Sequence, residues 1–195
     1  SFAHYFSTLR DLFRKRGLQF TQELYYPALT QPLIEFFERH FGKDVVGEVL
    51  SELQMRSNED ALSVQPYREI FTTLQHLFEN NKRVAVWTNR DLISAKLILN
   101  QTGLSRLIEH CISGTCLPRK PNPEALRQIA RRFGVETQAL TMVGDHEHDV
   151  EAAKSVGAMA VRASWHSYWE IGKCQKADLQ FYKASDFYSW VQSLP

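Results

Sequence analysis

The chain has 195 residues, of which 44% are hydrophobic and 23% are charged, and its formal net charge is +1. This is an ordinary globular composition, sufficient for one domain with a small insert or for two small domains. Lys and Arg are scattered, and no apolar run approaches the ~18 residues that cross a bilayer, so we expect neither a nucleic-acid nor a membrane partner. The sequence does not indicate an oligomeric state.

The location of the protein is predicted from its N-terminal residues and its cysteines. Residues 1–16 carry charges throughout and lack the apolar stretch of a signal peptide. Cys111, Cys116 and Cys174 are odd in number and form no C-x-x-C pair, so we interpret them as reduced thiols. Together these features predict a cytoplasmic protein.

Residues 1–63 are predicted to form a small, all-helical domain. Apolar residues at helical spacing in 2–13 indicate a first helix. Pro32 lies near the start of a second helix, and Asp44 is a candidate N-cap of a third helix that runs to about Met55. Because aromatic residues normally fill cores, we expect the aromatic stripe to form the core of a helical bundle rather than a ligand pocket. The pattern leaves open which of Tyr5, Tyr25 and Tyr26 face a substrate.

Residues 64–195 are predicted to alternate strands with helices, an order that gives a parallel sheet with right-handed crossovers. The fold class is therefore α/β, with a Rossmann-like three-layer core. Neither G-x-G-x-x-G nor G-x-x-x-x-G-K-[ST] occurs, so dinucleotide and P-loop binding are not supported. The expected strands are 83–87, 111–113, 140–143, 159–161 and 178–181, and the expected helices are 66–80, 92–102, 123–133, 150–156 and 185–194.

Three strand ends carry polar groups that could meet at one edge of the sheet, where open α/β sheets bind ligands. Thr88 and Asn89 follow the first strand, and a hydroxyl with nearby backbone N–H groups could hold a phosphate oxygen. Lys120 lies in a loop stiffened by prolines, and a fixed ammonium can offset the charge of a transferring phosphoryl group. Asp145 and Asp149 bring two carboxylates together, a donor set that suits Mg²⁺.

Each of these groups also has an ordinary structural interpretation. Thr and Asn commonly mark turns, and a surface lysine is usually solvated. On their own stretch, a cation site and a turn with a helix cap are equally good interpretations of Asp145 and Asp149. His146 and His148 raise the option of a transition metal, which we disfavour because structural metal sites usually need four ligands.

The three motifs together resemble those of the haloacid dehalogenase superfamily. Residues 84–89, Val-Ala-Val-Trp-Thr-Asn, resemble motif II, and residues 120–123, Lys-Pro-Asn-Pro, resemble the K-P-x-P form of motif III. Residues 143–158 resemble motif IV, G-D-x-x-x-D-x-x-A-A-x-x-x-G-A. The branch that the chain is most similar to is the phosphoglycolate phosphatase-like one, which has a helical cap. Residues 1–63 fit that cap, and residues 64–195 fit the core.

The resemblance implies a role for each candidate residue. Thr88 binds the phosphoryl group, with Asn89 beside it, and Lys120 stabilises a phosphoaspartyl intermediate. Asp145 and Asp149 bind Mg²⁺ directly or through water. Ser113 and Gly114 are added as loop residues near the phosphate.

One motif of the family is missing. No two aspartates of the chain have the D-x-D spacing of motif I, D-x-D-G-T, whose first Asp is the nucleophile and whose second is the general acid and base. We therefore expect the first core strand to be missing and the nucleophile to lie on a segment upstream of Ser1. Three explanations remain: an omitted N-terminal piece, a strand supplied by another chain or segment, and a degenerate member that binds without catalysis. We favour the first, because Thr88, Lys120 and the two acids remain.

The expected function is that of a phosphatase. The intact protein should be a Mg²⁺-dependent phosphomonoester hydrolase that acts on a small phosphorylated metabolite through an aspartyl phosphate. The 195-residue chain alone should be inactive. The alternatives are a non-catalytic phosphate-binding or regulatory module and a phosphomutase, whereas a dehalogenase would leave the acid pair without a role.

Overall fold

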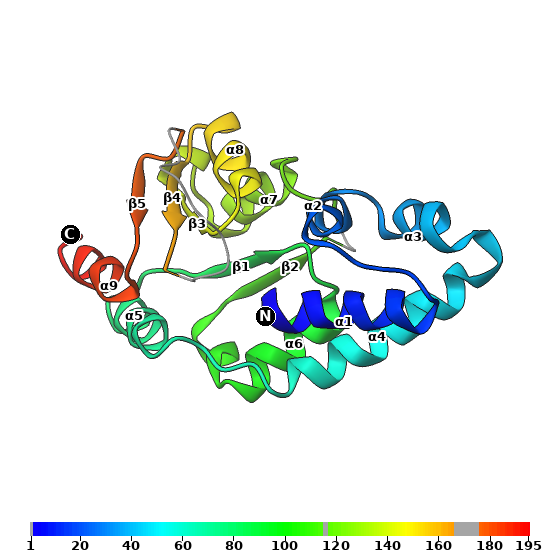
Figure 1. The fold of residues 1–195 in the computed structure, drawn as a ribbon. Helices are drawn as coiled ribbons and strands as arrows, with labels where there is room; N and C mark the ends of the chain where they lie inside the picture. The colour runs from blue at the N-terminus through cyan, green and yellow to red at the C-terminus, as the bar shows by residue number, and fades with distance from the viewer. Residues whose placement is uncertain (1, 115–116, 166–175) are drawn as a thin grey trace. The chain divides into compact units, whose positions relative to one another are not determined.

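The computed structural model describes residues 2–114, 117–165 and 176–195. The chain divides into two compact units, Ser1–Val64 and Gln65–Pro195. The first unit is helical and the second contains every described strand (Figure 1). No helix among the described residues is long and apolar enough to cross a membrane.

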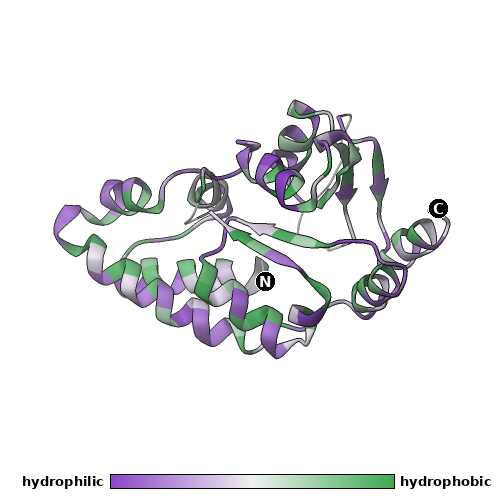
Figure 2. Cartoon of the chain, turned by 180° about the vertical axis from the view of Figure 1, so that it is seen from behind, coloured by the Kyte–Doolittle hydropathy of each residue, from purple (hydrophilic) through white to green (hydrophobic). Residues whose placement is uncertain are grey.

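The first unit is built on one long helix. Helices α1 (Phe2–Lys15) and α3 (Leu33–Phe41) both pack against α4 (Val46–Ala61). Bands of apolar residues alternate with polar ones along these helices (Figure 2), as expected for helices that bury one face. Phe13, at 1% exposure, lies at the centre of the buried face, which confirms that the aromatic stripe is mainly core. Its other fully buried members are Leu9, Leu12, Phe36, Phe37 and Val49.

Two helices of this unit differ from expectation. Helix α2 (Gln22–Thr30) was not expected, because it contains Pro27, which normally breaks a helix. Helix α4 begins after a short 3₁₀ turn, Lys43–Val45, and continues past Met55. Its buried face continues through small residues, so the apolar pattern that predicts a helix fades before the helix ends.

The second unit has the expected order of strands and helices, with ends shifted by up to three residues. Helix α8 shows the largest shift: it begins at Glu147 rather than at residue 150, because a side-chain cap starts it early. The elements are α5 (Arg68–Glu79), β1 (Ala85–Thr88), α6 (Leu92–Gln101), β2 (His110–Ser113), α7 (Glu124–Phe133), β3 (Thr141–Gly144), α8 (Glu147–Ser155), β4 (Met159–Ala163), β5 (Leu179–Phe181) and α9 (Ala184–Gln192), with 3₁₀ turns at Leu104–Leu107 and Thr137–Ala139.

The strands form two parallel sheets rather than one. Strand β1 pairs with β2, and β3, β4 and β5 pair in that order. Within the described ranges no strand joins β1 to β3, so each of these two strands has one edge without a partner strand. This division agrees with the expected lack of a central strand.

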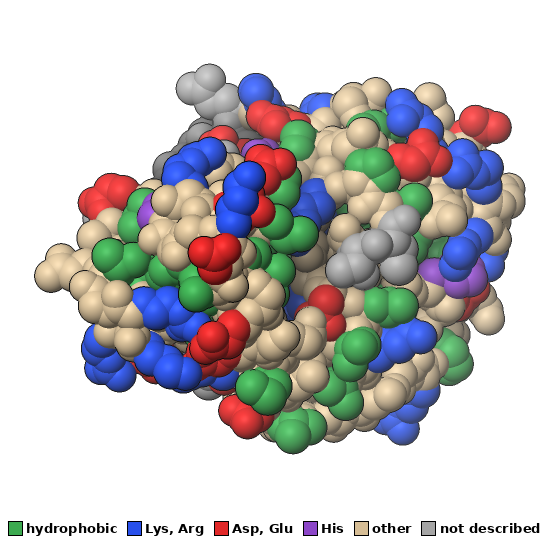
Figure 3. Space-filling model, turned by 90° about the vertical axis from the view of Figure 1, so that its right-hand side faces the viewer, with side chains coloured by type: hydrophobic (Ala, Val, Ile, Leu, Met, Phe, Trp, Pro, Cys, Tyr) green, Lys and Arg blue, Asp and Glu red, His purple; other side chains and the backbone are tan. Residues whose placement is uncertain are grey.

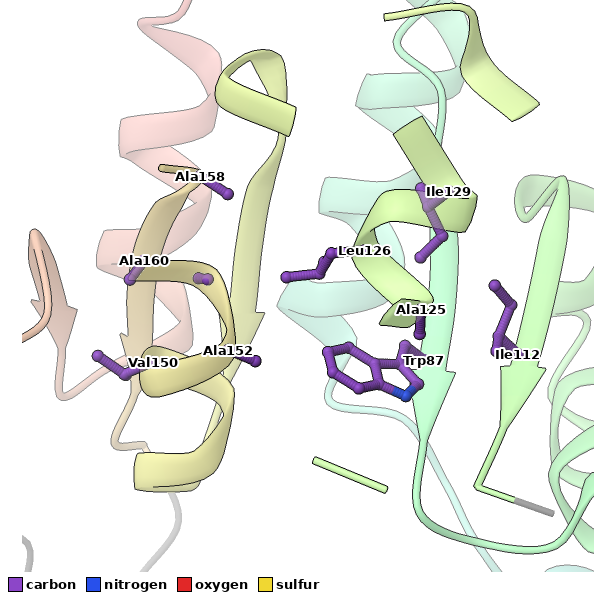
Figure 4. Close-up of a cluster of buried hydrophobic side chains, with 10 residues drawn as sticks. Trp87, Ile112, Ala125, Leu126, Ile129, Val150, Ala152, Ala158 and Ala160 are labelled. Atoms are coloured by element: carbon purple, nitrogen blue, oxygen red, sulfur yellow. The ribbon is translucent and has the colours of Figure 1, made fainter. Parts of the chain in front are cut away.

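A common apolar core nevertheless connects the two sheets. Trp87 of β1 and Leu126 of α7 belong to the same buried cluster as Ala152 of α8 and Ala160 of β4. In Figure 4, Leu126 projects from α7 toward the side of Ala152 and Ala158. A second cluster, around Val161, Phe187 and Val191 with Ile70 and Leu77 packed against it, joins the sheet β3–β5 to α9 and α5. Helices thus pack on both faces of this sheet, which is the expected three-layer arrangement.

Charged side chains of both signs are mixed on the surface. On the face drawn in Figure 3, Lys and Arg side chains are interspersed with Asp and Glu. This agrees with a net charge of +1 and with the scattered basic residues of the sequence.

Candidate active site

The carboxyl ends of β1 and β2 bring the first three candidate residues together. Thr88 lies opposite Ser113 in the register, and the backbone N–H of Gly114 donates to the Thr88 carbonyl at 2.8 Å. Ser113 is fully buried. A Cβ at Gly114 would lie 3.2 Å from both the Asn89 Cα and the Arg119 Cγ, so the two loops approach closely because this position is glycine.

Asn89 connects this strand end to the lysine loop. Its side-chain Oδ1 accepts a hydrogen bond from the backbone N–H of Lys120 at 3.2 Å. The Thr88 Oγ1 accepts from the backbone N–H of Arg90 at 3.1 Å, so Thr88 does serve a turn, as its ordinary interpretation holds. This bond uses an acceptor of the hydroxyl and leaves its hydrogen to donate.

Lys120 reaches across to helix α8. Its Nζ lies 2.7 Å from the Asp149 Oδ1, and the two side chains are 13% and 4% exposed. The approach is an ion pair that lacks hydrogen-bond geometry. Nζ also lies 4.9 Å from the centroid of the Trp87 ring, a cation–π distance. The lysine is therefore held between β1 and the first turn of α8.

Asp149 is both a helix cap and part of this site. Its Oδ2 accepts from the backbone N–H of His146 at 2.9 Å, while the His146 Nδ1 accepts from the backbone N–H of His148 at 3.2 Å. The two interactions form a capping box at the start of α8. The cap interpretation of Asp149 is thus correct, but its second oxygen still faces Lys120.

Burial lowers the pKa of His146, and the neighbouring His148 lowers it further. The ring must be neutral at Nδ1 to accept the capping bond. Because the pKa of His146 is lower in the folded protein, the unfolded chain binds a proton at this ring at a higher pH than the folded chain does. The cap's contribution to stability is therefore complete above the unfolded pKa of about 6.5. It is lost as the pH falls through the lower folded-state pKa.

We therefore expect His146→Asn to flatten the dependence of stability on pH below about 6.5, because asparagine caps a helix without titrating. At about pH 8 the variant should differ from the parent by less than about 1 kcal/mol. Urea unfolding at a series of pH values measures both effects. An unchanged slope would show that His146 does not couple the cap to pH.

Gly144 permits the close approach of β3 to α8. A Cβ at this position would lie 2.3 Å from the Asp149 Cγ, a distance at which backbone or side chain must move. We expect Gly144→Ala to cost about 1–3 kcal/mol of unfolding free energy, as overpacked sites do. Gly47→Ala is the matched control: nothing lies within 4 Å of its added Cβ, and this helix position should gain roughly 0.5–1 kcal/mol. Chemical denaturation distinguishes the two, and equal effects would contradict the packing described for Gly144.

The carboxylate donors suit a hard cation whose remaining ligands are supplied by water and substrate. Asp145 is exposed directly after β3, and the buried Asp149 Oδ1 has no hydrogen-bond partner. Mg²⁺ commonly takes one or two carboxylates together with phosphate oxygens, so these residues fit it. Within the described residues no group of three or more His, Cys, Asp and Glu side chains could hold a metal.

Contacts thus connect most of the candidate residues, and they also reveal residues that the sequence did not single out. The sequence places Gly144 in motif IV but does not show that this residue makes room for Asp149. Trp87 was counted as part of a strand and not as a partner of Lys120. Arg162, a buried arginine in an apolar strand, was missed, although one charge among Met-Ala-Val-Arg-Ala is itself a signal. The residues that the contacts connect are Thr88, Asn89, Ser113, Gly114, Lys120 and Asp149.

Known proteins share this fold. A structure described as a predicted phosphoglycolate phosphatase from Haemophilus somnus matches with a TM-score of 0.82 and 20% identity, covering 98% of this chain and 92% of that one. The β-phosphoglucomutase of Clostridium difficile matches with a TM-score of 0.78 and 17% identity, covering 97% and 88%. At these identities the likeness shows the fold alone, and it confirms the α/β class.

The sequence itself matches a family and a named relative. The phosphoglycolate phosphatase of Neisseria meningitidis is 36% identical over 110 residues, which are 55% of this chain and 47% of that protein. The matched part therefore spans about half the length of that relative. A family model described as haloacid dehalogenase-like hydrolase matches residues 2–163, most of the chain. The chain belongs to the haloacid dehalogenase-like hydrolase family.

Proposed function

We propose that the intact protein is a Mg²⁺-dependent phosphomonoester hydrolase that acts on a small phosphorylated metabolite through an aspartyl phosphate. The observation that carries the proposal is the Lys120–Asp149 ion pair of 2.7 Å, which links the lysine loop to the acidic start of α8. A lysine, two acids and a threonine at neighbouring strand ends suit a phosphate dianion with its counter-cation. The names of the relatives support the same reaction class.

The roles of the residues follow from their positions. Lys120 would hold a phosphoryl oxygen and offset its charge, with its ammonium already oriented by Asp149 and Trp87. Thr88 would donate its hydroxyl hydrogen to a second oxygen, with Asn89, Ser113 and Gly114 shaping the loop around it. Mg²⁺, when bound, would offset the repulsion between the phosphate and the carboxylates.

Asp145 is the better candidate for a direct Mg²⁺ ligand, and Asp149 for a second or water-mediated one. Asp145 is exposed, whereas Asp149 already accepts one hydrogen bond and pairs with Lys120. In this assignment Asp149 orients both Lys120 and the start of α8. Because its two partners fix the Asp149 carboxylate, it is less able than Asp145 to adjust its position to coordinate a metal directly.

The attacking carboxylate should come from outside residues 1–195. No D-x-D pair occurs in the chain, and both β1 and β3 have an edge without a partner strand within the described residues. A parallel strand between β1 and β3 would join the two sheets and place its carboxyl end beside Thr88 and Asp145. Its first aspartate would attack the phosphorus in line, breaking the ester P–O bond and forming an aspartyl phosphate, while the second aspartate protonates the departing alcohol. Water would then attack the phosphorus, release inorganic phosphate and regenerate the aspartate.

We further propose that residues 1–63 act as a cap domain and residues 64–195 as the catalytic core. A cap that covers the site during the reaction would exclude bulk water and select the leaving group. We also propose a cytoplasmic location, because the cysteines show no paired spacing.

Two alternatives remain. A phosphomutase shares the aspartyl phosphate, and its fold is represented among the similar structures. A binding or regulatory module is favoured by the missing D-x-D pair. Both alternatives predict phosphate binding. Unlike a phosphatase, a mutase would form an isomerised phosphate ester and a binding module would form no product.

Product analysis separates these functions. The test protein, called here the extended protein, carries a D-x-D-G-T strand from a family member joined before Ser1. With Mg²⁺ and a panel of small phosphomonoesters, we expect catalytic release of inorganic phosphate. Isomerised sugar phosphate without net phosphate release would indicate a mutase. Binding of inorganic phosphate without any turnover by the folded extended protein would indicate a binding module.

A further inference from the structure

Arg162 is a buried charge at the carboxyl end of the sheet β3–β5. It lies on β4, opposite Gly144 of β3, and is 6% exposed. Side chains two residues apart on a strand share a face. Arg162 therefore shares the face of Ala160, which packs with Val150, Ala152 and the other residues of the α8 core.

The pairing of β3 with β4 places Arg162 beside the strand end that leads into α8. Gly144, its register partner, directly precedes Asp145. Arg162 is thus close to the proposed Mg²⁺ ligand but on the next strand, away from β1 and from Thr88.

The guanidinium has buried donors without partners. Its Nε and Nη1 have no hydrogen-bond partner among the described residues. Other arginines of the chain show the usual contrast: Arg83 makes three hydrogen bonds to the Glu109 carboxylate. An arginine stays protonated under all ordinary conditions, so burial cannot neutralise it. A buried charge with two donors that have no partner among the described residues is costly, which makes this position unusual for a purely structural residue.

We propose that Arg162 binds a second anionic group of the substrate, a carboxylate or phosphate, besides the phosphoryl group that is hydrolysed. The inference rests on the proposed function and adds the substrate class: small phosphomonoesters that carry another negative charge. A planar guanidinium with free N–H groups matches the oxygen pairs of carboxylates and phosphates. Lys120 and Thr88 lie on the β1 side and Arg162 on β4, so the two anionic groups occupy different positions.

The first test observes the donor itself and needs no catalysis. In the 195-residue chain with Mg²⁺, the Arg162 Nε–H resonance is assigned by its loss in Arg162→Lys. Pyrophosphate, which carries two phosphate groups, is the probe, and inorganic phosphate is the single-anion comparison. We expect pyrophosphate to shift the resonance at saturation in the parent and in Lys120→Met. A resonance that does not move at saturating pyrophosphate would overturn the proposal, whether or not the extended protein hydrolyses phosphomonoesters.

The second test measures affinity by titration calorimetry. In Arg162→Met, we expect pyrophosphate binding to weaken at least about tenfold, because a charged hydrogen bond is lost. In Arg162→Lys, we expect it to weaken about threefold, because that hydrogen bond is replaced by one from an ammonium. Binding of inorganic phosphate should stay within about twofold, since Lys120 holds it. Arg127→Met, at a half-exposed position on α7, is the control and should bind both anions as the parent does. Equal weakening of both anions, or of neither, would contradict a second-anion site at Arg162.

Discussion

Replacing Lys120 with methionine should lower kcat/KM of the extended protein about 10²–10³-fold, as the loss of one fixed donor to a developing charge does. The ammonium is oriented before substrate binds, because Asp149 and the Trp87 ring hold it from two sides. Methionine keeps much of the side-chain volume and removes the charge. Steady-state rates of phosphate release measure the effect.

Two further variants separate charge at this position from charge in general. Lys120→Arg keeps the charge but not the compact ammonium, so it should recover only part of the activity. Lys183→Met removes an exposed lysine and should leave kcat/KM within about twofold of the parent. If Lys120→Met, shown to be folded, matched Lys183→Met, Lys120 would have no role in phosphoryl transfer.

The same lysine should have a large effect on stability. Lys120→Met leaves the 3%-exposed Asp149 with an unpaired charge, and breaking such a buried pair costs about 3 kcal/mol. Asp149→Asn should cost less, because the asparagine oxygen can still accept from the His146 N–H and preserve the cap.

The double variant tests whether the two residues act as a pair. Without either charge, Lys120→Met with Asp149→Asn should be more stable than the sum of the single effects by at least about 1 kcal/mol. Denaturant unfolding of the parent, both single variants and the double variant gives this coupling energy. Strictly additive losses would mean that the 2.7 Å approach contributes nothing to folding.

Most of the core could be predicted because its strands are short apolar runs with clear ends. β1 ends at Thr88 and β3 at Gly144, close to where turn residues indicate an end. The apolar faces of α5 and α7 likewise show in the sequence as regular helical spacing. Helix α2 could not be predicted in this way, because Pro27 lies inside it and tertiary packing overrides the local preference.

The site was predicted in its residues but not in its connections. Spacing brings Lys120 and Asp149 to the same edge of a sheet, but only the folded chain shows that they pair. From the sequence, a helix cap and a cation site are alternative interpretations of Asp149. In the structure its Oδ2 caps α8, while its Oδ1 faces Lys120 of the candidate site. The unpartnered donors of Arg162 depend on long-range packing, which spacing does not encode.

The most direct test of the proposed function is the rate of phosphate release by the extended protein, measured with Mg²⁺ and again with excess EDTA. We expect turnover only with Mg²⁺, and a loss of at least about 10³-fold in Asp145→Asn, since the proposed direct ligand is then gone. The 195-residue chain without the added strand should release no phosphate. A folded extended protein that releases phosphate equally well in EDTA, or that tolerates Asp145→Asn, would contradict the Mg²⁺-dependent phosphatase proposed here.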